Sequence, residues 1–514
     1  MHPPSADPSP FDLRRVSAAV EPWPLHDSAA TRRVESRALA RCAPHALMSR
    51  AGLDVARLAQ AVAPHARHIT VLAGPGNNGG DGLIAALHLH RQGRQVRLVH
   101  LADPARLPAD AADALRQLVE ARVALTGMPP DLQDTDLLID GLLGLGASRP
   151  PEGSIARAID TANASGRPVL AIDLPSGLNI DTGQPWGDKA LRADWTLSLL
   201  TLKPGLFTAL GRDLAGDVWI DNLGIADGEP ATSWLGAFGM PPAGAFPGRR
   251  HVQHKGSFGD VTIVGGADGM QGAASLAARA ALTAGAGRVF MHLLASEPHA
   301  FASPEVMRSP TGWLTDAAAL SRSTVVCGCG GGAHVAAVLP TLLQGAGRLV
   351  LDADALNAVA ADRTLQDLLQ ARAARGAVSV LTPHPLEAAR LLGCSTAAVQ
   401  ADRLSAGKDL CARFGSVVLL KGSGTVMLAP ALAPWINASG NAALAAPGSG
   451  DVLAGWVGGL WAQQAGGAAE GAWLAVRAAT WLHGHAADRR HLQGPIRLPL
   501  RAADLIEAMA DALH

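Results

Sequence analysis

The stretch LAGPGNNGGDGLIAALHLH, residues 72–90, combines residue types that could bind sugar hydroxyls or a hydrated cation. Asn77, Asn78 and Asp81 stand among glycines, after an apolar run and before a helical pattern. Backbone amides of such a turn and the N-terminus of the next helix attract anions. The spacing matches neither G-x-G-x-x-G nor G-x-x-x-x-G-K-[ST]. From glycine content alone, a plain turn explains the stretch as well as a binding site does.

Three more polar motifs in the first half follow apolar runs. DLLIDGLLGLGASRP places Asp140 before a second glycine-rich loop, LAIDLPSGL contains Asp173 and Ser176, and LSLLTLKPG ends in Lys203. Asp81, Asp140 and Asp173 lack an obvious arginine partner, and a bound cation would relieve their repulsion. Lys203 would stabilise an oxyanion, bind phosphate, or lie solvated on the surface.

The strongest motif of the second half is AAPGSGDVLAGWVGGL, where Gly450 and Asp451 precede a helix of small residues. Amides at a helix N-terminus can neutralise a phosphoryl group in transfer, and an adjacent aspartate can deprotonate the attacking hydroxyl. The alternative is that Asp451 only caps the helix.

Other polar residues of the second half also follow apolar runs. His384 in TPHPLE would contact substrate or serve a structural role, and Lys421 opens the Gly-Ser-Gly turn of KGSGT. Asp352 lies in a similar position in LVLDADALN. Cys327 and Cys329 lack the further ligands that a zinc site needs, so we expect no metal there.

The elements that must position these residues alternate along the chain. Six short continuous apolar runs in each half, separated by helical patterns, predict a parallel sheet covered on both faces in each half. The Pro- and Gly-rich stretch 228–250 predicts a linker between a domain at residues 1–227 and one at 251–514. Ligands of such sheets bind at the carboxyl ends of the strands, where nearly all of these motifs lie.

The composition excludes several classes of function. The net charge is −1 without a charged block, which predicts neither a nucleic-acid partner nor an anionic membrane surface. The five cysteines form no CxxC pair and fit free thiols in the cytoplasm, and no signal peptide is expected. We expect the uncharged stretch 452–469 to be a buried helix rather than a membrane span. Only five of the 43 basic residues are lysines, so a lysine beside a glycine-rich turn suggests a need for an ammonium group.

GPGNNGGDG, DGLLGLG and IDLPSGL, in this order, resemble the epimerase domain of the bifunctional NAD(P)H-hydrate repair enzymes. The resemblance implies a Rossmann-like three-layer α/β/α sandwich. It implies a potassium ion held by Asn78, Asp140 and Ser176, and Asp173 at the reacting centre, as a proton shuttle or as a group that orients the ribose. The implied contacts with the hydrated dinucleotide are Asn77, Asn78, Gly79, Gly80, Asp81, Gly144, Leu145, Gly146, Ala147, Ser148, Arg149 and Pro150.

HKGSFGDVTIVGG, GCGGG, DADALN, TPHP, KGSGT and GSGDVLAG are similar to the ribokinase-like NAD(P)H-hydrate dehydratases. The resemblance implies Asp451 as the base, Gly330 and His384 at the hydrate, and Mg²⁺ arriving with ADP. The implied nucleotide contacts are Lys421, Gly422, Ser423, Gly424, Thr425 and Gly450. The chain departs from the family pattern at six positions, which are Cys329, Leu386, Ala442, Ala443, Ala446 and Pro447.

The two resemblances imply one repair function. The first domain would interconvert the R and S epimers of NADH and NADPH hydrate, and the second would dehydrate the S form at the expense of ADP, through a phosphorylated C6 hydroxyl. The alternative is a ribokinase-like kinase of a small vitamin-precursor alcohol with a non-catalytic binding domain. We further expect a homo-oligomer.

Overall fold

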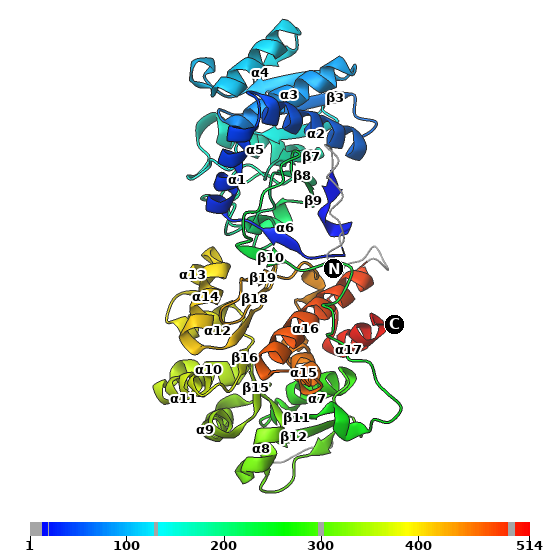
Figure 1. Cartoon of the computed structure of the whole chain (residues 1–514), viewed down its shortest axis with the longest axis vertical. Helices are drawn as coiled ribbons and strands as arrows, with labels where there is room; N and C mark the ends of the chain where they lie inside the picture. The colour runs from blue at the N-terminus through cyan, green and yellow to red at the C-terminus, as the bar shows by residue number, and fades with distance from the viewer. Residues whose placement is uncertain (1–12, 19, 128–131, 297–302, 492–498, 514) are drawn as a thin grey trace. The chain divides into compact units, whose positions relative to one another are not determined.

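The chain divides into two compact α/β units, Met1–Leu235 and Gly236–His514 (Figure 1). The computed structural model describes residues 13–18, 20–127, 132–296, 303–491 and 499–513. The stretch predicted as a linker, 228–250, contains this division. Part of that stretch is ordered as a short strand, β10 (Ser233–Leu235), which pairs antiparallel with β2 (Trp23–Leu25).

The first unit is built on one twisted, mostly parallel sheet. All six runs predicted as strands in this half form strands, and they are neighbours in register. Their β-branched and leucine side chains are buried on both faces, as a doubly covered sheet requires. The sheet order is β1 (Arg14–Arg15), β9 (Asp217–Asp221), β8 (Trp195–Leu199), β7 (Val169–Ile172), β6 (Leu137–Gly141), β3 (His68–Ala73), β4 (Gln95–His100) and β5 (Ala124–Thr126).

The strand order reverses between β3 and β6. The chain moves from β3 through β4 to β5 on one side, and from β6 through β7 to β9 on the other. At such a switch point the connections after the two strands diverge and leave a crevice at the carboxyl ends. Asn77–Asp81 follow β3 and Asp140 lies at the end of β6, so both motifs border this crevice.

Helices cover both faces of this sheet. Val71 and Ala73 of β3 pack under one group of helices, whereas the alternate residue Leu72 packs under α5 on the opposite face. The result is the three-layer sandwich that the sequence predicts. The helices are α1 (Ser28–Arg41), α2 (Ala46–Val62), α3 (Asn77–Arg91), α4 (Ala109–Glu120), α5 (Gly153–Ser165) and the short α6 (Gly211–Leu214).

The second unit has a longer sheet of the same kind, and its six predicted strands are again present and parallel. The order reverses between β11 and β14, and β17 continues into antiparallel β18 and β19. The order in this unit is β13 (Met307–Arg308), β12 (Arg288–Leu293), β11 (Asp260–Gly265), β14 (Thr324–Cys327), β15 (Arg348–Leu351), β16 (Ser379–Leu381), β17 (Val417–Leu420), β18 (Val426–Leu428) and β19 (Trp435–Ile436).

Two groups of helices enclose this second sheet (Figure 1). On one face lie α7 (Gln271–Thr283), α15 (Ser449–Ala462), α16 (Ala468–His491) and α17 (Ala502–Asp511). The other group comprises α8 (Ala317–Arg322), α9 (Val335–Gly345), α10 (Ala353–Ala361), α11 (Arg363–Ala374), α12 (Pro385–Leu392), α13 (Thr396–Ala401) and α14 (Arg403–Phe414).

Helix α15 is the buried helix predicted from its small residues. All its residues from Val452 to Ala462 are buried. The helix ends at Ala462, whereas the predicted stretch extends to residue 469. A Cβ added at Gly455 would lie 2.2 Å from the Ala277 carbonyl oxygen, so glycine permits close contact with α7. Within the described part of the chain, no helix has the length and apolar character needed to cross a membrane.

Candidate active sites

A cavity of about 560 Å³ lies at the switch point of the first unit. Its walls come from the start of α3, the loop after β6, the end of β7 and the segment after β8, together with side chains of α1 and α2. Among its lining residues are Asn77, Asn78, Asp81, Gly144, Leu145, Gly146, Ala147, Ser148, Arg149, Pro150, Asp173 and Lys203. The structure therefore brings together most of the residues predicted for this site from GPGNNGGDG, DGLLGLGASRP and IDLPSGL.

The glycine-rich stretch is helical from its first asparagine, not a loop. Helix α3 begins at Asn77 after Gly76, so Asn78 and Asp81 lie within its first turns. Gly79 and Gly80 are buried: a Cβ at Gly79 would meet the Gly74 carbonyl oxygen, and one at Gly80 the Met48 side chain. These glycines pack the helix closely against its neighbours, while the asparagines and Asp81 face the cavity.

Asp140 and Ser176 form one hydrogen-bond network at the base of this site. The Ser176 hydroxyl and amide donate to the two Asp140 carboxylate oxygens, at 2.6 and 2.8 Å. The Leu143 amide donates to the Ser176 Oγ, and the Asn78 side-chain amide donates to the Leu143 carbonyl at 3.0 Å. Asp140 is fully buried, and this burial raises its pKa to about 6 despite the hydrogen bonds. The three predicted cation ligands thus meet in one place.

Asp173 has a partner that its motif does not reveal. The Lys203 ammonium is fully buried and forms an ion pair with the Asp173 carboxylate. Lys203 also donates to the Ser198 hydroxyl and to the Leu199 carbonyl, at 3.1 and 2.8 Å. The alternative of a solvated surface lysine is therefore wrong, and the partner of Asp173 is a lysine rather than an arginine. Asp173 has φ +67°, a left-handed conformation in which an aspartate is better tolerated than most residues.

Glu35 of α1 is a cavity residue that lies outside all of the sequence motifs named above. Burial raises its pKa, and the neighbouring Asp173 raises it further, whereas Lys203 and Arg32 lower it. Burial likewise raises the pKa of Asp81 well above its usual value, with Asp173 and Glu35 adding to the effect. The cavity therefore contains carboxyl groups that hold protons more tightly than usual, close to one ion-paired carboxylate.

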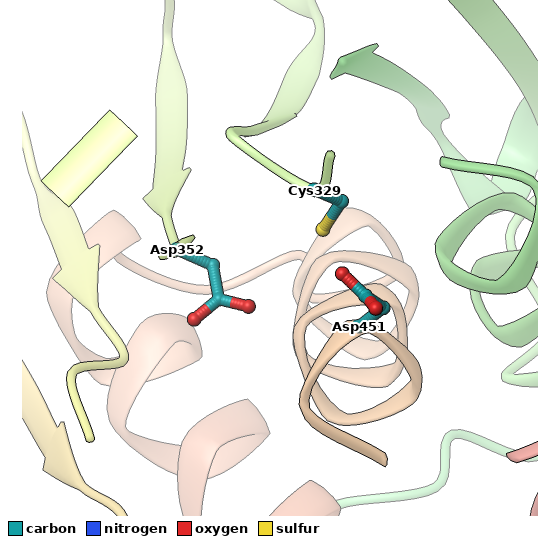
Figure 2. A group of neighbouring side chains, drawn as sticks. All are labelled: Cys329, Asp352 and Asp451. Carbon is teal, nitrogen blue, oxygen red and sulfur yellow. The ribbon is translucent and has the colours of Figure 1, made fainter. Parts of the chain in front are cut away.

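The second site lies at the switch point of the second unit, where Asp451 occupies the first turn of α15. The side chains of Cys329, Asp352 and Asp451 converge there, with one ligand atom of each within 4.8 Å of the others (Figure 2). Burial raises the pKa of Asp451 to about 6, and the Asp352 carboxylate contributes to the rise.

Lys421 connects the predicted nucleotide turn to this cluster. Its ammonium group lies 2.7 Å from an Asp352 carboxylate oxygen, which also accepts from the Thr382 hydroxyl at 2.8 Å. A Cβ at Gly450 would lie 3.3 Å from the Lys421 Nζ, so the start of α15 adjoins this lysine. The five residues from Lys421 to Thr425, including Gly422, Ser423 and Gly424, connect β17 to β18, as predicted.

His384 and Glu387 form a capping box at the start of α12. The Leu386 and Glu387 amides donate to the His384 Nδ1, and the His384 amide donates to the Glu387 carboxylate at 2.8 Å. His384 therefore has the structural role named as the alternative above, although its side chain is 45 % exposed and accessible to a ligand. Gly330 follows β14 at the switch point with φ +58°. Their contact with substrate stays a prediction.

The chain is similar to known proteins over both units. The family model of the YjeF-related protein N-terminus matches residues 44–205, and that of NAD(P)H-hydrate dehydratase matches residues 261–508. The bifunctional NAD(P)H-hydrate repair enzyme of Leishmania braziliensis is 37 % identical over 478 residues, covering 86 % of this chain and 84 % of that protein. The enzyme of that name from Escherichia coli K12 is 36 % identical and covers 81 % of each chain.

A similar solved structure is the ADP/ATP-dependent NAD(P)H-hydrate dehydratase from Bacillus subtilis, crystallised with ATP and Mg²⁺. It is 26 % identical and covers 52 % of this chain and 93 % of its own, with a TM-score of 0.42.

Proposed function

Because the chain belongs to the family of bifunctional NAD(P)H-hydrate repair enzymes, we propose that its two switch-point sites perform the two steps of that repair. The cavity of the first unit epimerises C6 of the hydrated dinucleotide, and the Asp451 site of the second unit dehydrates the S epimer. The observation that carries this proposal is the convergence of the separate motifs of each unit at one strand-order reversal.

Asp173 is the residue proposed to move the proton during epimerisation. C6 of the hydrate bears a hydroxyl and the ring nitrogen, so its inversion proceeds by loss and return of hydroxide or by ring opening, and either route needs a positioned proton donor and acceptor. Asp173 borders the cavity, and the buried Lys203 ammonium fixes its carboxylate. The ordered first turn of α3 and the loop from Gly144 to Pro150 would hold the dinucleotide beside it.

A potassium ion fits the network formed by Asp140, Ser176 and Asn78. The network offers carboxylate, hydroxyl and amide oxygens, which are the ligands that hard cations prefer. Of the described lysines and arginines, none forms an ion pair with the buried Asp140 carboxylate, so a negative charge there has no cationic partner from the protein. A bound ion would supply that positive charge at the base of the cavity.

In the second unit, Asp451 is proposed to accept the proton of the C6 hydroxyl as that oxygen attacks the terminal phosphorus of ADP. Transfer of one phosphoryl group leaves AMP and a phosphorylated hydrate, and the ring nitrogen lone pair then expels phosphate to restore the dihydronicotinamide. The start of α15 and Lys421 provide positive potential for the transferring group. Mg²⁺ needs few protein ligands when it arrives with the nucleotide.

The comparisons favour this function over a vitamin-precursor kinase with a non-catalytic first domain, because the relatives named as repair enzymes match the chain across both units. All five cysteines are free, which supports the proposed cytoplasmic location. The expectation of a homo-oligomer stays a prediction.

The test is regeneration of NADH from a mixture of both NADH-hydrate epimers with ADP and Mg²⁺, followed by absorbance. The intact chain should convert the whole mixture. Asp451→Asn should abolish recovery yet leave epimer exchange intact, while Asp409→Asn, an exposed aspartate of α14, should behave like the parent. Recovery by Asp451→Asn at the parent rate would show that the base is another residue. Conversion of only part of the mixture, beyond spontaneous epimerisation, would refute the function of the first unit.

A further inference from the structure

Cys329 lies beside the proposed base, although it belongs to a different part of the sheet. It follows β14 at the switch point, and its side chain is fully buried. Figure 2 shows its sulfur directed at the Asp451 carboxylate, with Asp352 on the other side of the gap. The three groups come from three separate segments, after β14, after β15 and at the start of α15.

Of the Cys329 thiol and the Asp451 carboxylate, only the thiol has a hydrogen to donate. Burial, Asp451 and Asp352 together raise the pKa of Cys329 well above that of an ordinary cysteine, so its sulfur stays protonated. A protonated thiol beside a carboxylate can donate its single hydrogen. The Cys329 sulfur lies within 4.8 Å of an Asp451 carboxylate oxygen, and donation from the thiol to that carboxylate would lower the pKa of Asp451, against the effect of burial. The same burial makes Cys329 a poor nucleophile, which leaves donation as its chemistry.

Of the other charged groups around Asp451, some raise its pKa and one lowers it. Asp352 after β15 and Asp354 in the first turn of α10 raise its pKa, whereas the Lys421 ammonium at the end of β17 lowers it. The His483 Nε2 of α16 donates to the Ser449 carbonyl oxygen, 3.0 Å away, and burial lowers the pKa of His483 to about 4, so the ring is neutral above that pH. Lys421 is paired with Asp352, whereas Cys329 brings a neutral donor to the side of Asp451.

We propose that Cys329 is a positioning residue of the dehydratase, which holds the Asp451 carboxylate ionised and oriented toward the C6 hydroxyl by donating a hydrogen bond from its thiol. The inference rests on the proposed role of Asp451 as the base. Cys329 touches neither substrate nor nucleotide in this role, and acts only through Asp451.

The test compares the pH dependence of kcat/KM for NADH recovery in Cys329→Ala and Cys329→Ser. Loss of the donor in the alanine variant should move the acid limb to higher pH by about 0.5–1 unit, because a thiol is a weak donor to a charged acceptor. At pH values below that acid limb, kcat/KM for NADH recovery should then fall about three- to tenfold. The serine variant keeps a donor of similar size and should keep the limb near its parent position. Cys394→Ala, which removes an exposed thiol, is the matched control.

Two outcomes would overturn the inference: an alanine variant with an unmoved limb, or a serine variant that moves it as far as alanine does. If Asp451→Asn itself recovers NADH, the base assignment fails instead, so the two failures are distinguishable. An activity-independent measurement covers variants that fold poorly. The infrared S–H band of Cys329, assigned by subtracting the spectrum of Cys329→Ser, should shift as Asp451 titrates near pH 6, and a band that does not shift contradicts the hydrogen bond.

Discussion

Replacing Lys203 with methionine should destabilise the first unit far more than removing any surface charge. The change keeps the apolar length of the side chain but deletes the ammonium group that pairs with Asp173. It also removes the hydrogen bonds to the Ser198 hydroxyl and the Leu199 carbonyl. Because Lys203 is fully buried and Asp173 nearly so, losing the partner leaves a poorly solvated carboxylate.

The expected cost is about 3–5 kcal/mol, as for other buried pairs that lose one partner. Asp173→Asn should cost a similar amount for the opposite reason, since it leaves the ammonium uncompensated. Asparagine tolerates the left-handed backbone at this position, so that variant reports on charge rather than on strain. The double variant Asp173→Asn/Lys203→Met has no buried charge left at the pair, and the two effects should couple by about 2–3 kcal/mol.

Hydrogen exchange followed by mass spectrometry can measure these effects in the full chain, through peptides that cover β7 and β8. At 1.36 kcal/mol per tenfold change, Lys203→Met should speed exchange there roughly a hundredfold to a few thousandfold. Lys189→Met, which breaks the exposed pair with Asp160, is the matched control and should cost less than about 1 kcal/mol. Exchange as slow in Lys203→Met as in the control, or strictly additive effects in the double variant, would refute the reasoning.

Two further predictions concern Asp140 and the close contact of α15. The pKa of Asp140 is about 6 in the folded protein, against 3.8 for an ordinary aspartate. Its contribution to the free energy of unfolding therefore falls by about 3 kcal/mol as the pH rises from 4 through 6. At pH 7.5 Asp140 is ionised, and a bound potassium ion would offset its buried charge. Thermal unfolding at that pH should then occur at higher temperature in KCl than in tetramethylammonium chloride. A difference that persists in Asp140→Asn would argue against potassium binding at Asp140. Gly455→Ala should cost about 1–3 kcal/mol and slow NADH recovery without affecting epimerisation, because the added methyl group meets the Ala277 carbonyl and displaces the helix that carries Asp451. Thermal unfolding and the recovery assay measure the effect of Gly455→Ala, with Gly466→Ala at an exposed glycine as the control. Equal behaviour of the two variants would contradict the packing argument.

The strands of both sheets could be predicted because each is a continuous apolar run between turn residues. HITVLAG and GDVTIVGG became β3 and β11 in this way. The short strands β5, β13 and β19 were not predicted, since runs of two or three residues have no periodicity to detect. The strand order that creates each switch point is a property of the assembled sheet, which no single motif specifies.

The candidate sites could be predicted only where a motif lies at the end of a strand. Glu35 lies on a helix that packs over the cavity from more than forty residues before Asn77, and nothing in TRRVESRALAR marks it as a site residue. The burial of Lys203 had one signal in the sequence, its position directly after the apolar run LSLLTL. The approach of Cys329 to Asp451 depends on how the end of β14 packs beside the start of α15, which only the structure shows.

The scarcity of lysine has a practical consequence for handling this protein. Of its five lysines, Lys203 and Lys421 are held on aspartates inside the two sites, whereas Lys189, Lys255 and Lys408 reach the solvent. Amine-reactive dyes and coupling esters need an accessible amine, whereas Lys203 is fully buried and the Lys421 side chain is only 19 % exposed beside Asp352. Among the lysines, such reagents should therefore attach the chain to a sensor surface or a fluorophore through those three side chains, and leave both candidate sites chemically untouched.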